Sequence, residues 1–171
     1  MRTGIRCLIV VLAVGLLATT AMAKDVPMPE GEVVLTVAGT IALTNQDGAF
    51  VLDMEMVKAL PKTAYLVEDP WLGEQVYAGV TLATLLEYVG APLGAEKVVL
   101  VASDDKEFEI ALADALVYPI LLAYESDGDE IIEGMGGPIK IAYPYNAYPE
   151  VEELYPPENW TWWVVTVRVD Y

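Results

Sequence analysis

The sequence predicts an α+β domain in which many short strands form mixed sheets and about three short helices connect them. Three observations support this class. Short runs rich in Val, Ile, Leu and Tyr recur along the chain and are typical of strands. A few stretches place apolar residues at helical spacing and end at Gly or Pro. Turns that contain Asp, Gly or Pro separate these segments.

The first 23 residues have the pattern of an export signal. Arg2 and Arg6 precede an apolar run, and an Ala-Met-Ala cleavage site ends at Ala23. We therefore predict cleavage after Ala23, a periplasmic or secreted protein, and no membrane contact once the signal is removed; an uncleaved anchor is the alternative. We expect residues 24–31 to be a mobile lead-in and residues 32–171 to form a single domain, which is long enough to bury a core.

The charge and composition of the processed chain exclude several classes of function. Seven basic and 26 acidic residues would remain after cleavage, a net charge of −19. We therefore expect no nucleic-acid partner, and a cation or a basic partner is electrostatically easier to bind. The only cysteine is Cys7, and the chain has no histidine. The processed chain thus lacks thiolate nucleophiles, His bases and Cys or His metal ligands, and we predict no catalytic or metal-binding residue.

The first half of the domain predicts strands around two short helices. The strands are expected at residues 32–38, 41–44, 49–52, 63–67 and 74–78. Asp53 is placed to cap a helix over residues 54–60, which the following proline closes. Thr81 is placed to cap a helix over residues 82–89, and Gly90 ends it.

The second half predicts further strands, one short helix and a long loop. The strands are expected at residues 97–102, 108–111, 120–124, 139–143 and 160–169. The helix is expected at residues 111–116. Residues 134–138 form a Gly-rich break that precedes a strand, so it is not a phosphate-binding loop, which precedes a helix. Residues 145–159 contain three prolines and several aromatics, and they predict a long loop.

One ordered series of features runs through most of the domain. In chain order it contains Gly79-Val80, the Leu-rich helix at 82–89, the strand at 98–102, Asp104-Asp105, the strand at 108–111, Leu122-Ala123-Tyr124, Asp127-Gly128, Gly136-Gly137-Pro138, Pro144, and Trp160 with Trp162. This series resembles the oxidoreductase molybdopterin-binding domain family. The resemblance implies the mixed-sheet fold of the sulfite oxidase catalytic domain.

The chain departs from that family where the cofactor would be held. The family uses a cysteine thiolate to coordinate molybdenum, and the processed chain has none. Lys140 stands where an Arg typically follows the Gly-x-Pro, Met135 where the family has a His, and Thr161 where a Lys usually precedes the Trp. The resemblance and these departures together predict a family member without a cofactor, with molybdopterin as the alternative.

Seven residues are candidates for ligand binding. They are Trp71, Asp104, Asp105, Lys140, Tyr145, Trp160 and Trp162. The aromatics could line a pocket for a small organic ligand, or they could only pin the long loop to the domain. If Trp160 begins a strand, Trp160 and Trp162 share one face and Trp163 points the other way. The aspartates could bind a cation or an amine, or they could be ordinary turn formers.

We therefore expect an exported sulfite-oxidase-like domain that binds a small molecule or an exported protein partner and is not an enzyme. A molybdopterin-dependent oxidoreductase is the alternative, and it rests on the resemblance. A third hypothesis is a calcium-stabilised domain, because residues 125–130 carry alternating acidic side chains. The spacing of the acids does not match an EF-hand, and a solvated acidic turn is the simpler interpretation.

Overall fold

The computed structural model describes residues 26–171 and confirms the α+β class, with one mixed and one antiparallel sheet. The predicted signal, residues 1–23, lies outside the described residues. The first sheet has the strand order β2-β1-β10-β5-β6, in which β1 and β10 are parallel and the other neighbours antiparallel. Its strands are β1 (Val33–Gly39), β2 (Phe50–Asp53), β5 (Lys97–Ala102), β6 (Glu107–Ala111) and β10 (Val164–Asp170).

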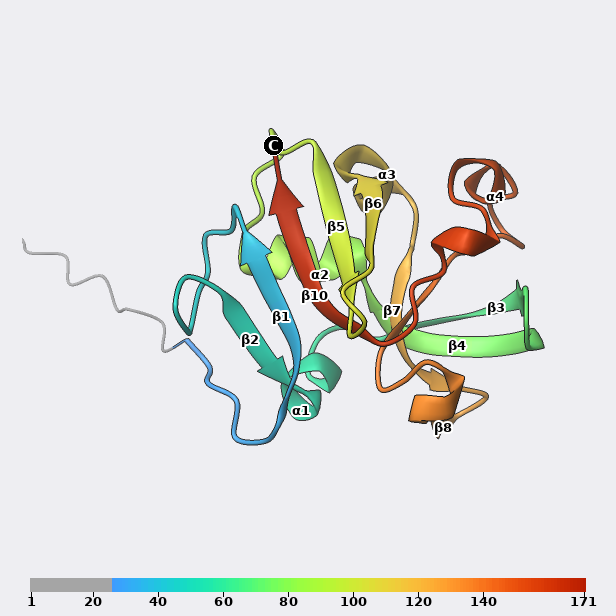
Figure 1. Cartoon of the computed structure of the whole chain (residues 1–171), viewed down its shortest axis with the longest axis horizontal. Coiled ribbons are helices and arrows are strands. Elements are labelled where there is room, and N and C mark those ends of the chain that lie inside the picture. The colour runs from blue at the N-terminus through green and yellow to red at the C-terminus, as the bar shows by residue number, and fades with distance from the viewer. Residues whose placement is uncertain (1–25) are drawn as a thin grey trace, which may run out of the picture.

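The second sheet packs beside the first and is antiparallel throughout (Figure 1). Its order is β3-β4-β7-β8, and β9 also pairs with β7. Its strands are β3 (Thr63–Asp69), β4 (Gly73–Thr81), β7 (Leu121–Ser126), β8 (Asp129–Glu130) and β9 (Lys140–Ala142). One core cluster joins buried side chains of both sheets, such as Val37 from β1 and Leu122 from β7.

Short helices connect the strands. They are α1 (Met54–Lys58), α2 (Leu82–Val89), α3 (Leu112–Val117), α4 (Glu150–Leu154) and the 3-10 turns η1 (Glu133–Met135) and η2 (Pro157–Asn159). The predicted long loop over residues 145–159 therefore contains the helix α4 and the 3-10 turn η2. The prolines of this segment had indicated only a loop. Within residues 26–171, no helix is both long and apolar enough to cross a membrane.

Helix α2 lies behind the first sheet in the view of Figure 1 and begins and ends as predicted. The Thr81 hydroxyl accepts a hydrogen bond from the Thr84 N–H, and Gly90 closes the helix at a φ of 66°. The Val89 carbonyl then accepts hydrogen bonds from the Ala42 and Leu43 N–H groups. Because these two N–H groups donate hydrogen bonds to the end of α2 and not to a neighbouring strand, residues 41–44 do not form the predicted strand.

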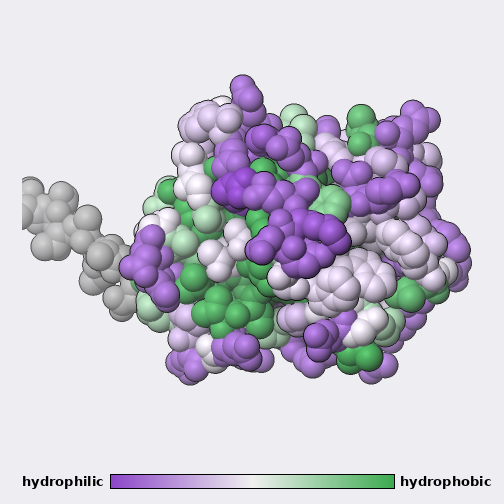
Figure 2. Space-filling model, in the orientation of Figure 1, coloured by the Kyte–Doolittle hydropathy of each residue, from purple (hydrophilic) through white to green (hydrophobic). Residues whose placement is uncertain are grey.

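The opposite face of the first sheet is turned to the viewer, and Figure 2 shows hydrophobic residues gathered there. Val34 from β1 and Thr166 from β10 are partly exposed, whereas Leu35 and Val167 point into the core. The alternation follows from the two-residue period of strands. The predicted lead-in reaches this side of the fold, where the Asp53 carboxylate accepts hydrogen bonds from the N–H groups of Glu30 and Gly31.

The last strand begins later than the sequence predicts. Strand β10 begins at Val164 rather than at Trp160, because Trp163 has a φ of 54° and breaks the extended backbone. Positive φ in a bulky residue is strained, and hydrogen bonds from other segments hold it here. The Trp163 N–H donates to the Gly136 carbonyl at 2.8 Å, and the Ser103 N–H donates to the Trp163 carbonyl at 2.9 Å. The two-residue period therefore does not apply to Trp160, Trp162 and Trp163, because all three precede the strand.

Candidate functional site

All four tryptophans of the chain line one cleft, which has a volume of about 480 Å³. Trp71 comes from the turn between β3 and β4, and Trp160, Trp162 and Trp163 come from the segment before β10. The lining residues are Trp71, Ala102, Asp104, Lys106, Phe108, Glu158, Trp160, Trp162 and Trp163. The cleft thus lies where turns of the two sheets meet.

Neighbouring indole rings in the cleft stand nearly perpendicular to one another. The ring centroids of Trp71 and Trp162 lie 6.0 Å apart at 83°, and those of Trp162 and Trp163 lie 5.7 Å apart at 75°. Trp71 also meets Trp160 at 6.2 Å and 76°. These are favourable edge-to-face arrangements. They present ring faces in several directions around the cleft.

The Gly-rich break fixes the positions of Trp162 and Trp163. A Cβ on Gly136 would lie 2.7 Å from the Trp162 Cγ atom, so only glycine leaves room for that ring. Gly136 also has a φ of 91°, which a side chain would disfavour. The Trp163 Nε1–H donates to the Glu133 carbonyl of the neighbouring η1 turn at 2.8 Å. The break therefore shapes the cleft wall, which explains why glycines precede the β9 strand.

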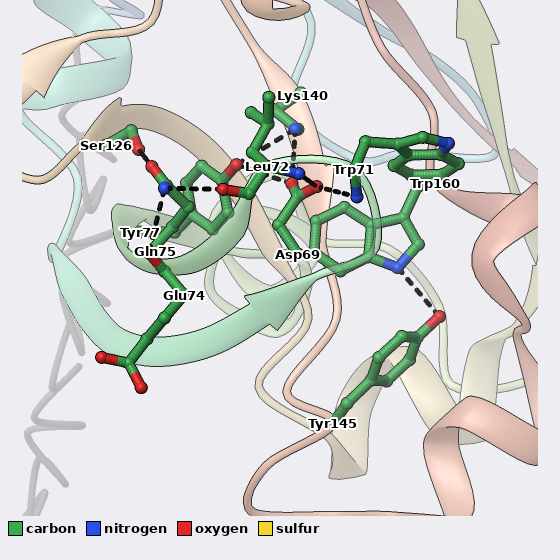
Figure 3. A network of polar contacts seen from close by, with 10 residues as sticks. All are labelled: Asp69, Trp71, Leu72, Glu74, Gln75, Tyr77, Ser126, Lys140, Tyr145 and Trp160. Atoms are coloured by element: carbon green, nitrogen blue, oxygen red, sulfur yellow. Dashed lines mark hydrogen bonds and ion pairs between the residues drawn. The ribbon is translucent and has the colours of Figure 1, made fainter.

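A buried ammonium lies against the same rings. Lys140 has no exposed surface, and its Nζ lies 2.9 Å from an Asp69 carboxylate oxygen and 3.1 Å from the Tyr77 hydroxyl (Figure 3). The Nζ also lies 5.3 Å from the ring centroid of Trp160 and 4.6 Å from that of Trp162. Both distances are typical of cation–π contacts. Lys140 does not line the cleft, although two of the cleft rings cover it.

The groups of this network have shifted pKa values. Burial lowers the pKa of the Lys140 ammonium, and the Asp69 carboxylate offsets this only in part. Burial raises the pKa of the Asp69 carboxyl, but hydrogen bonds from the Trp71 N–H, the Tyr77 hydroxyl and the Lys140 ammonium lower it by more. Burial raises the pKa of the Tyr77 hydroxyl most, and the Asp69 carboxylate raises it further.

Behind Trp160, tyrosines form a second aromatic group whose polar tips are hydrogen-bonded. The Trp160 Nε1–H donates to the Tyr145 hydroxyl at 2.8 Å (Figure 3). That hydroxyl in turn donates to the Tyr155 carbonyl. The Tyr143 and Tyr155 rings stack at 5.5 Å, and the Tyr155 hydroxyl donates to an Asp114 carboxylate oxygen at 2.6 Å. Since these residues are buried and satisfied, they serve the fold.

Four of the seven predicted candidates meet in the cleft. They are Trp71, Asp104, Trp160 and Trp162. The other three do not line it. Tyr145 is buried behind Trp160, Lys140 is buried beneath the rings, and Asp105 occupies the β5–β6 turn at a φ of 64°.

The sequence interpretation missed several residues that build the site. Trp163 and Glu158 line the cleft, as do Lys106 and Phe108. Asp69 supplies the partner of Lys140, and its position directly before the Pro-Trp pair was the one available signal. Nothing in the sequence paired Asp69 with Lys140, because the two are 71 residues apart.

Every basic side chain in residues 26–171 is paired with a carboxylate. The pairs are Lys58–Glu130, Lys62–Glu125, Lys97–Glu109, Lys106–Asp104, Lys140–Asp69 and Arg168 with Glu107 and Asp170. In the cleft, Lys106 is 2.7 Å from Asp104, and Glu158 has no basic partner within the described part of the chain. The accessible charge of the cleft is therefore negative.

Three of the four carboxylates in the acidic turn over residues 125–130 contact other groups of the protein. Glu125 pairs with Lys62 and Glu130 with Lys58, while an Asp127 carboxylate oxygen accepts the Val76 N–H. The described residues contain no group of three or more acidic, Cys or His side chains placed to hold a metal ion. The turn is accordingly an ion-paired hairpin, and the structure lends no support to the calcium hypothesis.

Comparisons with known proteins agree with this fold. Residues 45–148 match the oxidoreductase molybdopterin binding domain family. The crystal structure of the sulfane dehydrogenase SoxCD from Paracoccus pantotrophus is similar, with a TM-score of 0.64 and 14% sequence identity. That match covers 80% of this chain and 37% of the SoxCD chain, and an identity this low shows the fold alone. A comparison with curated protein sequences found no match.

Proposed function

This chain belongs to the oxidoreductase molybdopterin-binding domain family, and we propose that it is a member without the molybdenum cofactor that binds a small organic molecule. The ligand occupies the tryptophan cleft, either as a free molecule or as a side chain of an exported protein partner. One observation carries this proposal: all four tryptophans of the chain line a single cleft. Its volume, about 480 Å³, lies within the range of small-molecule sites.

The donor set around the cleft does not fit a molybdenum pterin. The family holds the metal with a cysteine thiolate, and residues 26–171 contain neither cysteine nor histidine. The phosphate of the cofactor needs free cations or a helix N-terminus. The two lysines at this site are engaged, since Lys106 pairs with Asp104 and Lys140 is buried against Asp69. The residues around the cleft therefore do not fit the cofactor.

The exposure of Trp71 and the strained backbone of Trp163 support a binding role. Trp71 is 53% exposed, although a large aromatic ring gains free energy from burial. The strained backbone of Trp163 adds a second cost, typically about 1–3 kcal/mol for a residue in a rare conformation. Features that cost stability and are held rigidly in a cleft are typical of ligand sites, where they are ordered before the ligand arrives.

Tryptophan fluorescence and thermal unfolding test this proposal with a broad panel of metabolites. Because every tryptophan lines the cleft, a bound ligand is expected to change the intrinsic fluorescence. It also raises stability by about 2.7 kcal/mol at one hundred times its Kd. Trp71→Ala should weaken binding, whereas Tyr171→Ala, which removes an exposed aromatic outside the cleft, should leave it unchanged. A ligand that binds both variants equally well would contradict the assignment of the cleft.

Family membership favours the second candidate, a molybdopterin-dependent oxidoreductase. Elemental analysis decides between the two when the protein is purified from a host that makes the cofactor. We expect molybdenum far below one equivalent and no pterin fluorescence after denaturation. One equivalent of molybdenum together with released pterin would overturn the cofactor-free proposal.

A further inference from the structure

We propose that the ligand of the tryptophan cleft is an organic cation, an ammonium group that carries methyl or methylene substituents. The inference rests on the proposed function, because it names the ligand class for the same cleft. Three features carry it: the arrangement of the rings, the charge at the rim, and the cation that two of the rings already hold.

The ring arrangement suits a round, apolar cation. Trp162 stands nearly perpendicular to both Trp71 and Trp163, at 83° and 75°, so the three rings offer faces and edges from different directions. An ammonium surrounded by carbon substituents is attracted to several ring faces at once and loses little hydration. A flat neutral ligand would be better served by parallel rings.

The charges at the rim of the cleft favour a positively charged ligand. Asp104 and Glu158 line the cleft with one cation, Lys106, which pairs with Asp104 at 2.7 Å. Each of the six basic side chains in residues 26–171 is already paired, while the whole sequence carries a net charge of −17. An anion would therefore meet no available cation, whereas a cation is attracted both by the cleft and by the surrounding field.

The chain itself shows that these rings accept an ammonium. The Lys140 Nζ lies 4.6 Å from the Trp162 centroid and 5.3 Å from that of Trp160. Lys140 is fully buried, so it uses these rings from within the protein. Neither Trp71 nor Trp163 makes a cation–π contact with a residue of the described chain, so both leave ring surface for a ligand. We infer that the ligand ammonium lies against Trp71 and Trp163, near Glu158.

A matched pair of probes tests the charge requirement. Choline carries a trimethylammonium group, and 3,3-dimethylbutan-1-ol has the same shape without the charge. In a fluorescence titration of the full processed chain, choline is expected to bind about tenfold more tightly than the neutral alcohol. Raising the salt concentration should weaken choline alone. Equal binding of the two probes, or binding of neither, would overturn the inference.

Rim variants locate the ligand. Glu158→Gln removes the unpaired rim carboxylate and should weaken choline binding about threefold, while the alcohol is unaffected. Glu152→Gln removes an exposed carboxylate of α4 outside the cleft, and its choline affinity should equal that of the wild type. Both variants keep every ion pair of the described fold. An equal loss in both would show that only net charge matters and would contradict the site.

Further experiments identify the source of the ammonium group. They also distinguish failure of the cation inference from failure of the proposed function. Tighter binding of a trimethyl-lysine peptide than of choline would assign the cation to a protein partner, and the reverse would assign it to a free molecule; either order supports the inference. If a neutral metabolite binds in the cleft while choline does not, the cation inference fails and the proposed function stands. If the purified chain carries one equivalent of molybdopterin, the proposed function itself fails.

Discussion

Two aromatic groups lie side by side in the molecule and differ in the exposure of their rings and in the hydrogen bonding of their indole N–H groups. The inner group consists of Tyr143, Tyr145, Tyr155 and Trp160, and the outer group consists of Trp71, Trp162 and Trp163. Trp160 is 4% exposed and its Nε1–H is hydrogen-bonded, whereas Trp71 is 53% exposed. The Trp162 Nε1 is buried without a partner among the described residues.

One stretch of sequence supplies both core and cleft. Trp160 and Trp162 are two residues apart, and both cover the Lys140 ammonium. Satisfied, buried rings stabilise the fold, whereas exposed or strained rings are available to a ligand. We therefore expect substitutions in the inner group and its buried ion pair to affect stability, and substitutions in the outer group to affect binding.

The largest expected effect comes from the ion pair beneath both groups. Lys140→Met leaves the Asp69 carboxylate buried without its cation, and it should lower the free energy of unfolding by about 3–5 kcal/mol. Lys140→Met combined with Asp69→Asn removes both charges and should recover a large part of that loss. Denaturant unfolding followed by circular dichroism measures the free energy of unfolding of the single and the double variant. A double variant no more stable than the single variant would contradict the electrostatic origin.

Trp160→Phe and Trp71→Phe compare the two groups directly. Trp160→Phe loses the hydrogen bond to Tyr145 and leaves a small cavity, which together cost about 1–3 kcal/mol. Trp71→Phe changes an exposed ring and should stay within about 0.5 kcal/mol of the wild type. Denaturant unfolding curves give both values. Equal losses would show that the distinction between inner and outer groups does not hold.

Acidification should weaken the ion pair in a predictable direction. The native pKa of Asp69 is lowered, so its contribution is complete above the unfolded value of about 3.9 and is lost as pH falls through the native pKa. Asp69→Asn lacks this contribution. Its unfolding free energy should therefore fall less steeply than that of the wild type below about pH 4. Parallel curves from unfolding series at stepped pH would argue against this role of Asp69.

Local patterns predicted most of the fold and only part of the site. The Thr81 cap, the Gly90 end and the apolar spacing of α2 are local, and the structure confirms them. The outer tryptophans were harder to place, because the positive φ of Trp163 depends on hydrogen bonds to Gly136 and Ser103. A two-residue period cannot foresee a backbone break that distant segments impose.

The buried pair could not be predicted for the same reason. Lys140 stood out as the only cation near the Gly-Pro break, but its partner Asp69 lies 71 residues earlier. Both lie within strands, and burial of a lysine is unfavourable unless it is paired. Only the successive pairing of β9 with β7, of β7 with β4 and of β4 with β3 brings the two side chains together.

Binding of an organic cation in the tryptophan cleft can be tested by an NMR titration of the four indole N–H signals with choline. The signals of Trp71 and Trp163 are expected to shift with a common Kd, because the ligand lies against their rings. The signal of Trp160, whose Nε1–H is hydrogen-bonded to the Tyr145 hydroxyl, should move least. If none of the four signals shifts, or if Trp160 alone responds, the tryptophan cleft is not the site of an organic cation.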